Sequence, residues 1–235
     1  MSYINIKGQL VKAAFVKRNN RFSCDVLYNG EVVSCHLPTS GRLAELLLPD
    51  ATVYIRKAVG EVQKRKTKYD LLQVDTKKGV RVSLDSQLPN RFVEKLLIEN
   101  NMPGFCDLKL IRREYTYGKS RMDFLVEDKK GVKTLIEVKS VTLVEDQIAK
   151  FPDAPTTRGT KHLNELTKSV KEGYKAKVLF MIQRNDAKSF SPNIKTDPQF
   201  SEALKEAHKS KVEINAFNCN IGKVIELGDE VEVEY

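Results

Sequence analysis

The sequence contains no tryptophan and only four cysteines among its 235 residues. It has no Cys-x-x-Cys pair and no cysteine–histidine set with zinc spacing, which argues against a structural zinc site. With 41% hydrophobic residues, the chain can bury a core without a disulfide framework. No apolar run approaches the roughly 18 residues of a membrane span, and the N-terminus lacks a signal-peptide pattern. These absences predict a cytoplasmic protein with one large domain or two smaller ones and no membrane partner.

The positive charge is concentrated in the first third of the chain. Residues 1–85 carry 15 basic and 8 acidic side chains, whereas residues 86–235 carry 25 and 23, so most of the net charge of +9 lies N-terminally. The densest stretch, with one acidic residue among them, contains Arg56, Lys57, Lys64, Arg65, Lys66 and Lys68. Clustered cations without an apolar face favour a polyanion such as nucleic acid over a membrane. A solvated hairpin tip is the alternative.

The sequence around Asn29-Gly30 predicts a β-hairpin in the N-terminal half. Alternating apolar residues flank this dipeptide, which suits a two-residue turn because both positions tolerate positive φ. Such a turn places Cys24 opposite Cys35, at a separation that would permit a disulfide. In a cytoplasmic protein we expect two buried thiols instead.

The rest of the N-terminal half has the order of a small barrel. Thr39 and Ser40 can cap a short helix carrying Leu43, Leu46 and Leu47, and strands are expected over residues 52–59 and 69–75. Three strands, a helix and two strands match an OB-type barrel, although an SH3-like barrel fits almost as well. Arg42 could face phosphate at this helix N-terminus, or the segment could be only a turn and a cap. Residues 80–86 form a crossover without a glycine-rich linker, so we expect the two halves to pack together.

The C-terminal half predicts a mixed α/β domain. Asn90 can cap one helix and Asp197 can cap another. The polar segment 190–197, just before the second of these helices, is expected to be a loop. The expected elements in chain order are strands 108–117, 121–127 and 133–142, helix 159–172, strand 177–183, a helix after Asp197, and strands 212–218 and 224–235.

Two acidic residues are expected to lie side by side in this domain. A three-residue turn with Gly131 in the left-handed conformation would place Asp123 opposite Glu137. Lys139, two residues further on, shares their sheet face. Facing carboxylates repel each other unless a divalent cation such as Mg²⁺ or Mn²⁺ lies between them. The alternative is an ordinary exposed face on which Lys139 pairs with one of the acids.

The context of these residues resembles the PD-(D/E)xK nuclease core. The pattern Asp-x13-Glu-Val-Lys falls in the second and third strands of a helix, three-strand, helix, strand arrangement. Met122 stands where the proline of that motif would be. The resemblance implies catalytic positions for Asp123, Glu137 and Lys139, with the two acids as metal ligands.

Further segments, in order along the chain, carry a closer resemblance. They are His36-Leu37-Pro38, Gly41-Arg42-Leu43, Ser120-Arg121-Met122-Asp123-Phe124-Leu125, Ile136-Glu137-Val138-Lys139-Ser140-Val141-Thr142-Leu143, Phe151-Pro152-Asp153-Ala154 and Arg158-Gly159-Thr160-Lys161-His162-Leu163-Asn164-Glu165-Leu166. Together they resemble the sugar fermentation stimulation protein A family over essentially the whole chain. The resemblance implies DNA binding, an OB-like β-barrel over residues 1–85 and a restriction-endonuclease-like mixed sheet flanked by helices over residues 86–235.

These expectations define a candidate site and two competing functions. The cationic side chains proposed to contact DNA are Arg42, Lys64, Arg65, Lys66, Lys68, Arg121 and Lys161, with His162 and Arg158 as supporting residues. For His162 a capping or core role is the alternative, and Arg121 could instead pair with Glu137. The first function is a metal-dependent phosphodiesterase acting on DNA. The second is a non-catalytic DNA-binding regulator of sugar metabolism, and a plain interaction module is the third possibility.

Overall fold

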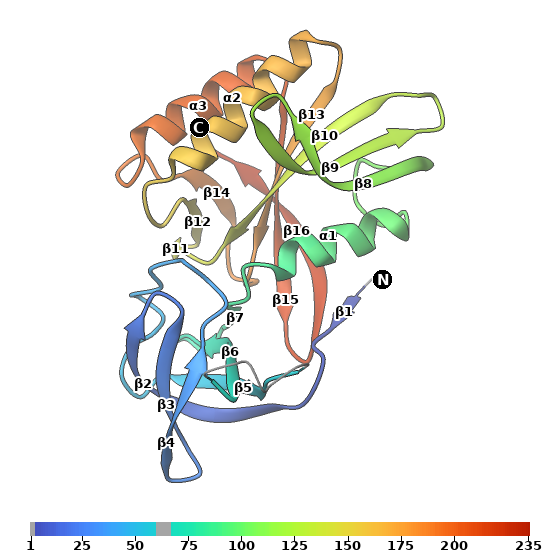
Figure 1. Ribbon diagram of the computed structural model, residues 1–235. Helices are drawn as coiled ribbons and strands as arrows, with labels where there is room; N and C mark the ends of the chain where they lie inside the picture. Colours follow the sequence, from blue (N-terminus) through green and yellow to red (C-terminus); the bar gives the residue numbers. More distant parts are fainter. Residues whose placement is uncertain (1–2, 60–66) are drawn as a thin grey trace.

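The computed structural model describes residues 3–59 and 67–235, which form two β-sheets packed end to end (Figure 1). The basic residues Lys64, Arg65 and Lys66 lie outside the described residues. The smaller sheet belongs to the N-terminal half, and the larger sheet with its helices belongs to the C-terminal half.

The N-terminal half is an OB-like barrel of five strands. The strands are β2 (Leu10–Asn20), β3 (Ser23–Tyr28), β4 (Glu31–His36), β5 (Thr52–Lys57) and β6 (Tyr69–Asp75). Their order, β4-β3-β2-β5-β6, is closed by a parallel pairing of β4 with β6. A short strand, β7 (Arg81–Ser83), extends the sheet beside β6. The closure confirms the expected OB-like architecture, and the alternating inward side chains of these strands form a separate core.

The Asn29–Gly30 hairpin has the expected register. Both turn residues have positive φ, at 53° and 82°, and Cys24 pairs with Cys35 across β3 and β4. The two cysteines are completely buried and are not linked by a disulfide. The hydrogen bond with Cys24, together with burial, raises the pKa of the Cys35 thiol, so the reactive thiolate is disfavoured.

This burial predicts a simple labelling result. Of the four free cysteines, only Cys106 is exposed, while Cys24, Cys35 and Cys219 are buried. A thiol reagent such as DTNB should therefore label one cysteine per native chain rapidly and all four after denaturation. Fast labelling of more than one thiol in the native protein would contradict the packing of this barrel.

The short helix expected after Thr39 does not form. Leu43 has a left-handed φ of 52°, which a helix interior excludes, and the amides of Leu46 and Leu47 both bond to its carbonyl in a single turn. The three leucines are nevertheless buried in the barrel core. Their helical spacing therefore indicated burial and not a helix. The expectation that Arg42 lies at a helix N-terminus is wrong for the same reason.

The C-terminal half contains a ten-stranded mixed sheet. Its strands are β1 (Tyr3–Asn5), β8 (Leu108–Tyr117), β9 (Ser120–Asp128), β10 (Lys133–Val141), β11 (Val144–Glu145), β12 (Ile148–Phe151), β13 (Lys175–Ile182), β14 (Ser189–Pro192), β15 (Glu213–Ile221) and β16 (Val224–Val233). The main order is β11-β12-β14-β16-β15-β13-β10-β9-β8. The polar segment 190–197, which was expected to be a loop, instead forms most of β14 with its first residues. This strand is held by parallel pairing with β12, a tertiary contact that the local sequence does not indicate.

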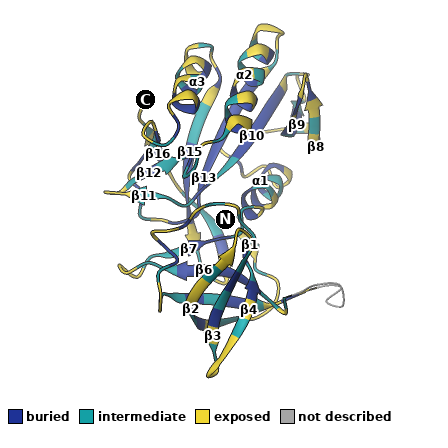
Figure 2. Ribbon diagram, turned by 60° about the vertical axis from the view of Figure 1, so that its left-hand side comes forward, coloured by how far each residue is buried: buried dark blue, intermediate teal, exposed yellow. Residues whose placement is uncertain are grey.

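Helices cover both faces of this sheet. α1 (Leu88–Ile98) packs on one face, and α2 (Thr157–Lys171) and α3 (Pro198–Lys209) lie side by side on the other (Figure 1). The strands between them, β10 and β13, are dark blue in Figure 2 because their apolar side chains are buried on both faces. The side chain of Asp197 caps α3 as expected, accepting a hydrogen bond from the Phe200 amide.

The two halves are joined by direct hydrogen bonds, as the absence of a flexible linker predicted. The Ser83 amide donates to the Gln183 carbonyl at 3.0 Å, and Gln73 donates to the Gly222 carbonyl at 2.7 Å. The first strand, β1, pairs with β16 in the C-terminal sheet. The expected division of the chain had assigned all of residues 1–85 to the barrel. Among the described residues, no helix is long and apolar enough to cross a membrane.

Candidate functional site

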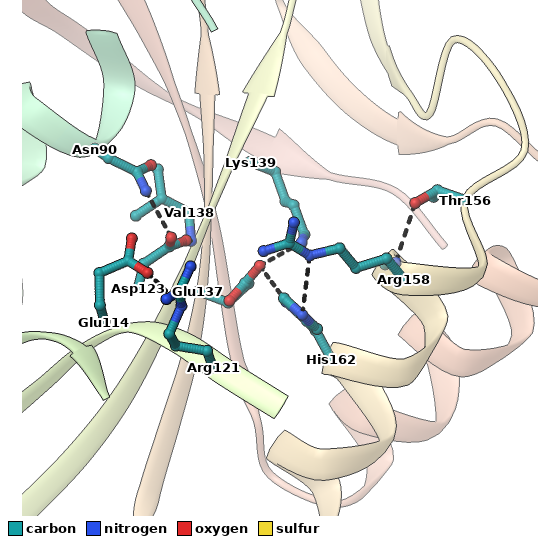
Figure 3. Close-up of polar contacts among 11 residues, drawn as sticks. Asn90, Glu114, Arg121, Asp123, Glu137, Val138, Lys139, Thr156, Arg158 and His162 are labelled. Atoms are coloured by element: carbon teal, nitrogen blue, oxygen red, sulfur yellow. Dashed lines mark hydrogen bonds and ion pairs between the residues drawn. The ribbon is translucent and has the colours of Figure 1, made fainter. Parts of the chain in front are cut away.

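The β9–β10 hairpin brings Asp123 and Glu137 together. Gly131 has a φ of 81° in the connecting turn, and the pairing runs from Lys133–Glu127 to Ile136–Phe124, so Asp123 and Glu137 follow as the next positions. At this point the hairpin ladder opens, and the Val138 amide donates to Asp123 Oδ2 at 2.7 Å (Figure 3). The two carboxylates, with Lys139 beside them, therefore lie on neighbouring strands near the middle of the sheet.

Asp123 is a buried carboxylate held at both oxygens. Besides the Val138 amide, the side-chain amide of Asn90 on α1 donates to Asp123 Oδ1 at 2.6 Å. Burial raises the pKa of Asp123 to about 6, and the negative charge of Glu137 adds to the effect. The two hydrogen bonds and Lys139 oppose this shift without cancelling it. A raised pKa in a buried acid indicates that a positive charge would be bound favourably here.

Glu137 is more deeply buried, with 3% of the residue exposed. Its Oε1 accepts hydrogen bonds from Lys139 Nζ and from His162 Nδ1, both at 2.5 Å. Burial raises its pKa, but the charge of Lys139 and the contacts of His162 outweigh burial and hold the pKa of Glu137 below its ordinary value. Its other oxygen, Oε2, is buried without a hydrogen-bond partner. An ionised carboxylate with one unsatisfied oxygen is prepared to bind a cation.

His162 and Arg158 fix the orientation of Glu137. Both residues lie on α2, and Arg158 Nε approaches His162 Nε2 at 3.4 Å. A guanidinium can only donate, so Nε2 is the acceptor and a neutral imidazole carries its proton on Nδ1. That Nδ1–H then donates to Glu137 Oε1. His162 is 4% exposed, so it is neither a helix cap nor a surface phosphate contact. It is a buried residue whose hydrogen bond orients the Glu137 carboxylate.

The donor set fits a hard divalent cation. Two carboxylates from adjacent strands would supply oxygen ligands, which Mg²⁺ and Mn²⁺ prefer, and one of those oxygens is unsatisfied. Within the described residues no group of three or more His, Cys, Asp or Glu side chains gathers as a metal-binding cluster. The carboxylates would thus provide only part of a coordination shell, as is usual for Mg²⁺, which keeps several waters or substrate oxygens.

The expected cationic residues that the structure describes lie in two parts of the molecule, some on the barrel and some in the C-terminal half. Lys68 and Arg42 are exposed on the barrel, and the Arg42 amide bonds to Asp153 at 2.7 Å. Arg121 is exposed and pairs with Glu114 at 2.6 Å, so it is not the partner of Glu137. Lys161 is also exposed and donates to the Lys119 carbonyl at 2.5 Å, next to the turn between β8 and β9.

Sequence patterns missed one residue of the site. Asn90 was expected to cap α1, but the helix begins at Leu88, after Gln87, and Asn90 lies in its first turn with its amide on Asp123. Proline at the start of the helix makes a side-chain cap less necessary, because one amide donor is absent. No local signal marks this role, because the contact depends on how α1 packs against β9.

Fold and site together define a two-domain protein with an OB domain and a restriction-endonuclease-like domain. Comparisons with known proteins agree: residues 16–84 match the family model described as "SfsA N-terminal OB domain", and residues 87–224 match "Sugar fermentation stimulation protein RE domain". The chain belongs to the sugar fermentation stimulation protein family, as the sequence motifs indicated.

Relatives and a solved structure cover nearly the whole chain. A sugar fermentation stimulation protein homolog of Alkaliphilus metalliredigens is 44% identical over 232 residues, which are 98% of this chain and 99% of the relative. A homolog of Clostridium tetani is 44% identical over 229 residues, 97% of this chain and 98% of that protein. The structure of Pyrococcus furiosus SfsA in complex with Ca²⁺ superposes with a TM-score of 0.90 at 31% identity and covers 100% of both chains.

Proposed function

We propose that the protein is a metal-dependent phosphodiesterase that cleaves DNA. The observation that carries this proposal is the pair of buried carboxylates, Asp123 and Glu137, with an unsatisfied Glu137 oxygen and Lys139 alongside. A protein that only binds DNA gains nothing from two acids near the phosphate backbone, because they repel it. Acids and a lysine in this arrangement suit a site that binds phosphate through a cation.

Each residue has a distinct role in this proposal. Asp123 and Glu137 would hold Mg²⁺ or Mn²⁺, and the bound ion would supply Lewis-acid stabilisation of charge on the phosphate. Lys139 is anchored on Glu137 Oε1, from which its ammonium can orient an attacking water and stabilise negative charge as it develops. Asn90 and His162 keep the carboxylates in place.

A related protein supports the binding of a divalent cation. The P. furiosus relative was solved in complex with Ca²⁺, a hard cation that binds oxygen ligands as Mg²⁺ does.

The proposed DNA contacts are Arg42 and Lys68 on the barrel, the neighbouring Lys64, Arg65 and Lys66, and Arg121 and Lys161 near the carboxylates. The N-terminal excess of basic residues supports binding to the phosphate backbone.

The proposal is tested by incubating the purified protein with single- and double-stranded DNA in Mg²⁺, Mn²⁺ or EDTA. Cleavage should need the divalent ion and should be lost in the Glu137→Ala variant. If neither ion supports cleavage of any DNA form, or the variant cleaves like the wild type, the proposal fails. DNA binding that weakens with salt but survives EDTA and Asp123→Ala, without cleavage, would favour the non-catalytic regulator.

Replacing His162 should weaken metal binding without unfolding the protein. Its Nδ1–H is one of two donors that hold Glu137 Oε1, the other being Lys139 Nζ, so His162→Ala leaves that carboxylate less firmly oriented towards a bound ion. Loss of such a supporting hydrogen bond typically costs about 10- to 100-fold in metal affinity. Mn²⁺ titration by calorimetry should show this loss in His162→Ala and no change in His208→Ala, an exposed histidine elsewhere on the surface. Equal affinities in the two variants would show that His162 does not position Glu137.

A further inference from the structure

A pocket lies between the two halves of the molecule and opens beside the carboxylate site. We call it the interdomain pocket; its volume is about 290 Å³. The barrel contributes Arg21 and residues 39–41, and the C-terminal half contributes residues 138–143 and 150–156. Lys139 lines this pocket and also bonds to Glu137, so the pocket and the proposed catalytic site share one residue.

The interdomain pocket is suited to an anion. Three cationic residues of the described chain line it, Arg21, Lys139 and Lys150. Lys150 is paired with Glu145 at 2.6 Å and Lys139 with Glu137 at 2.5 Å. Of these three cations, Arg21 is therefore the one without a carboxylate partner among the described residues. Among the described residues that line the pocket, the one acidic residue is Asp153, which accepts a hydrogen bond from the Arg42 amide. In addition, α2 begins next to the pocket at Thr156, and its first turn carries no acidic side chain to offset the positive end of the helix dipole.

The size and lining of the pocket favour one nucleotide. Ligand pockets range from about 300 Å³ upward, so a volume of this order suits a single small unit and not a duplex. Ser40, Ser140 and Thr142 are among the lining residues, and a hydroxyl group can bond to sugar or base atoms. A base can enter such a pocket only when it is unpaired.

An exposed aromatic ring also favours an unpaired strand. Phe22 is next in sequence to Arg21 of the pocket wall, and it lines a separate depression together with His36 and Pro38. Phe22 follows Arg21 in the turn between β3 and β2 and is 49% exposed, an unusual position for a phenylalanine. The Arg21 guanidinium lies 5.7 Å from the centre of this ring. Exposed aromatic rings next to cations are the elements on which OB-type domains stack successive unpaired bases.

We infer that the interdomain pocket holds one nucleotide of a single DNA strand, next to the phosphate at Lys139, while Phe22 stacks on a neighbouring base. The inference rests on the proposed function and specifies its substrate class as unpaired DNA. The barrel then serves as one wall of the substrate site and not only as a separate binding module.

The test measures binding of a fluorescein-labelled 15-nucleotide oligo(dT) by anisotropy in Ca²⁺, with a hairpin duplex as the comparison ligand. Ser40→Trp fills the pocket from an exposed loop position, and Ser40→Ala is its matched control. Arg21→Glu reverses a charge in the pocket, and Lys17→Glu makes the same change on an exposed barrel position outside it. Phe22→Ala removes the ring.

Ser40→Trp, Arg21→Glu and Phe22→Ala should each weaken oligo(dT) binding at least fivefold more than duplex binding, and more than their controls do. Base stacking alone can account for about tenfold or more. Unchanged oligo(dT) binding in these variants, or an equal loss for the duplex, overturns the inference. If the variants lose oligo(dT) binding while the wild type never cleaves DNA, the pocket assignment stands and the proposed cleavage fails.

Discussion

The Glu137→Gln variant should cleave DNA about 100- to 1,000-fold more slowly than the wild type in the presence of a divalent ion. The substitution keeps the size and shape of the side chain but removes its charge and replaces one carboxylate oxygen with an NH₂ group. Glu137 Oε1 already accepts from Lys139 and His162, so the oxygen available to a cation is Oε2, and in the variant at most one side-chain oxygen remains for all three. Losing a preorganised charged group at such a site typically costs two to three orders of magnitude in rate.

The matched control is Glu127→Gln on the same hairpin. Glu127 lies on β9, and its ion pair with Lys109 is at the surface, at 3.4 Å. The chemical change is identical, so any effect of charge or folding common to the hairpin appears in both variants. Initial rates on a labelled oligonucleotide in Mg²⁺ should therefore fall only for Glu137→Gln. Comparable rates for the two variants would mean that Glu137 has no part in the reaction.

Asp123→Asn should make the metal-free protein more stable at pH 8 while abolishing its response to Mg²⁺. Burial and the charge of Glu137 raise the pKa of Asp123 to about 6 from its ordinary value of 3.8. The folded state therefore holds this proton more tightly than the unfolded state. The contribution of Asp123 to the free energy of unfolding is complete below pH 4 and is lost as the pH rises through 6. Above that pH the protein has lost about 3 kcal/mol of this stability.

An asparagine avoids this cost without losing the hydrogen bonds. The Val138 amide can still donate to the side-chain oxygen, and Asn90 can turn its own oxygen towards the new NH₂ group. We expect a Tm increase of about 6 to 12 °C at pH 8, which disappears near pH 4, and no further increase with Mg²⁺. The wild type should gain stability from Mg²⁺ at pH 8 and much less at pH 5, where the proton competes with the ion.

Thermal unfolding of three proteins across pH 4 to 8 measures this effect. The control is Asp229→Asn, which changes an exposed carboxylate in β16. A wild type and Asp123→Asn with parallel pH profiles would contradict the burial of a repelling carboxylate pair. A Mg²⁺ response retained in Asp123→Asn would remove Asp123 from the set of ligands.

Local signals in the sequence predicted the parts of the fold that depend on turns. The register of β9 and β10 followed from Gly131, whose positive φ fixes the turn and thereby the neighbours of Asp123. The facing of Cys24 and Cys35 followed in the same way from Asn29-Gly30. In both hairpins a backbone conformation restricted to a few residue types determines the pairing of side chains several residues away.

Features that depend on packing between distant segments could not be predicted in this way. The leucines after Thr39 have helical spacing, yet the barrel core holds them in an irregular turn with Leu43 in the left-handed conformation. The contacts of Asn90 with Asp123 and of His162 with Glu137 join helices to strands that are 33 and 25 residues away in sequence. The interdomain pocket exists only because the two halves pack together.

In the proposed function, Asp123 and Glu137 hold the ion on which DNA cleavage depends. The most direct measurement follows Mn²⁺ occupancy by electron paramagnetic resonance and the cleavage rate in the same titration, for the wild type and Glu137→Gln at pH 8. We predict that the wild-type rate rises in proportion to the occupancy of a Mn²⁺ site that Glu137→Gln lacks. Cleavage at full rate before Mn²⁺ binds, or equal Mn²⁺ occupancy in the two proteins, would contradict it.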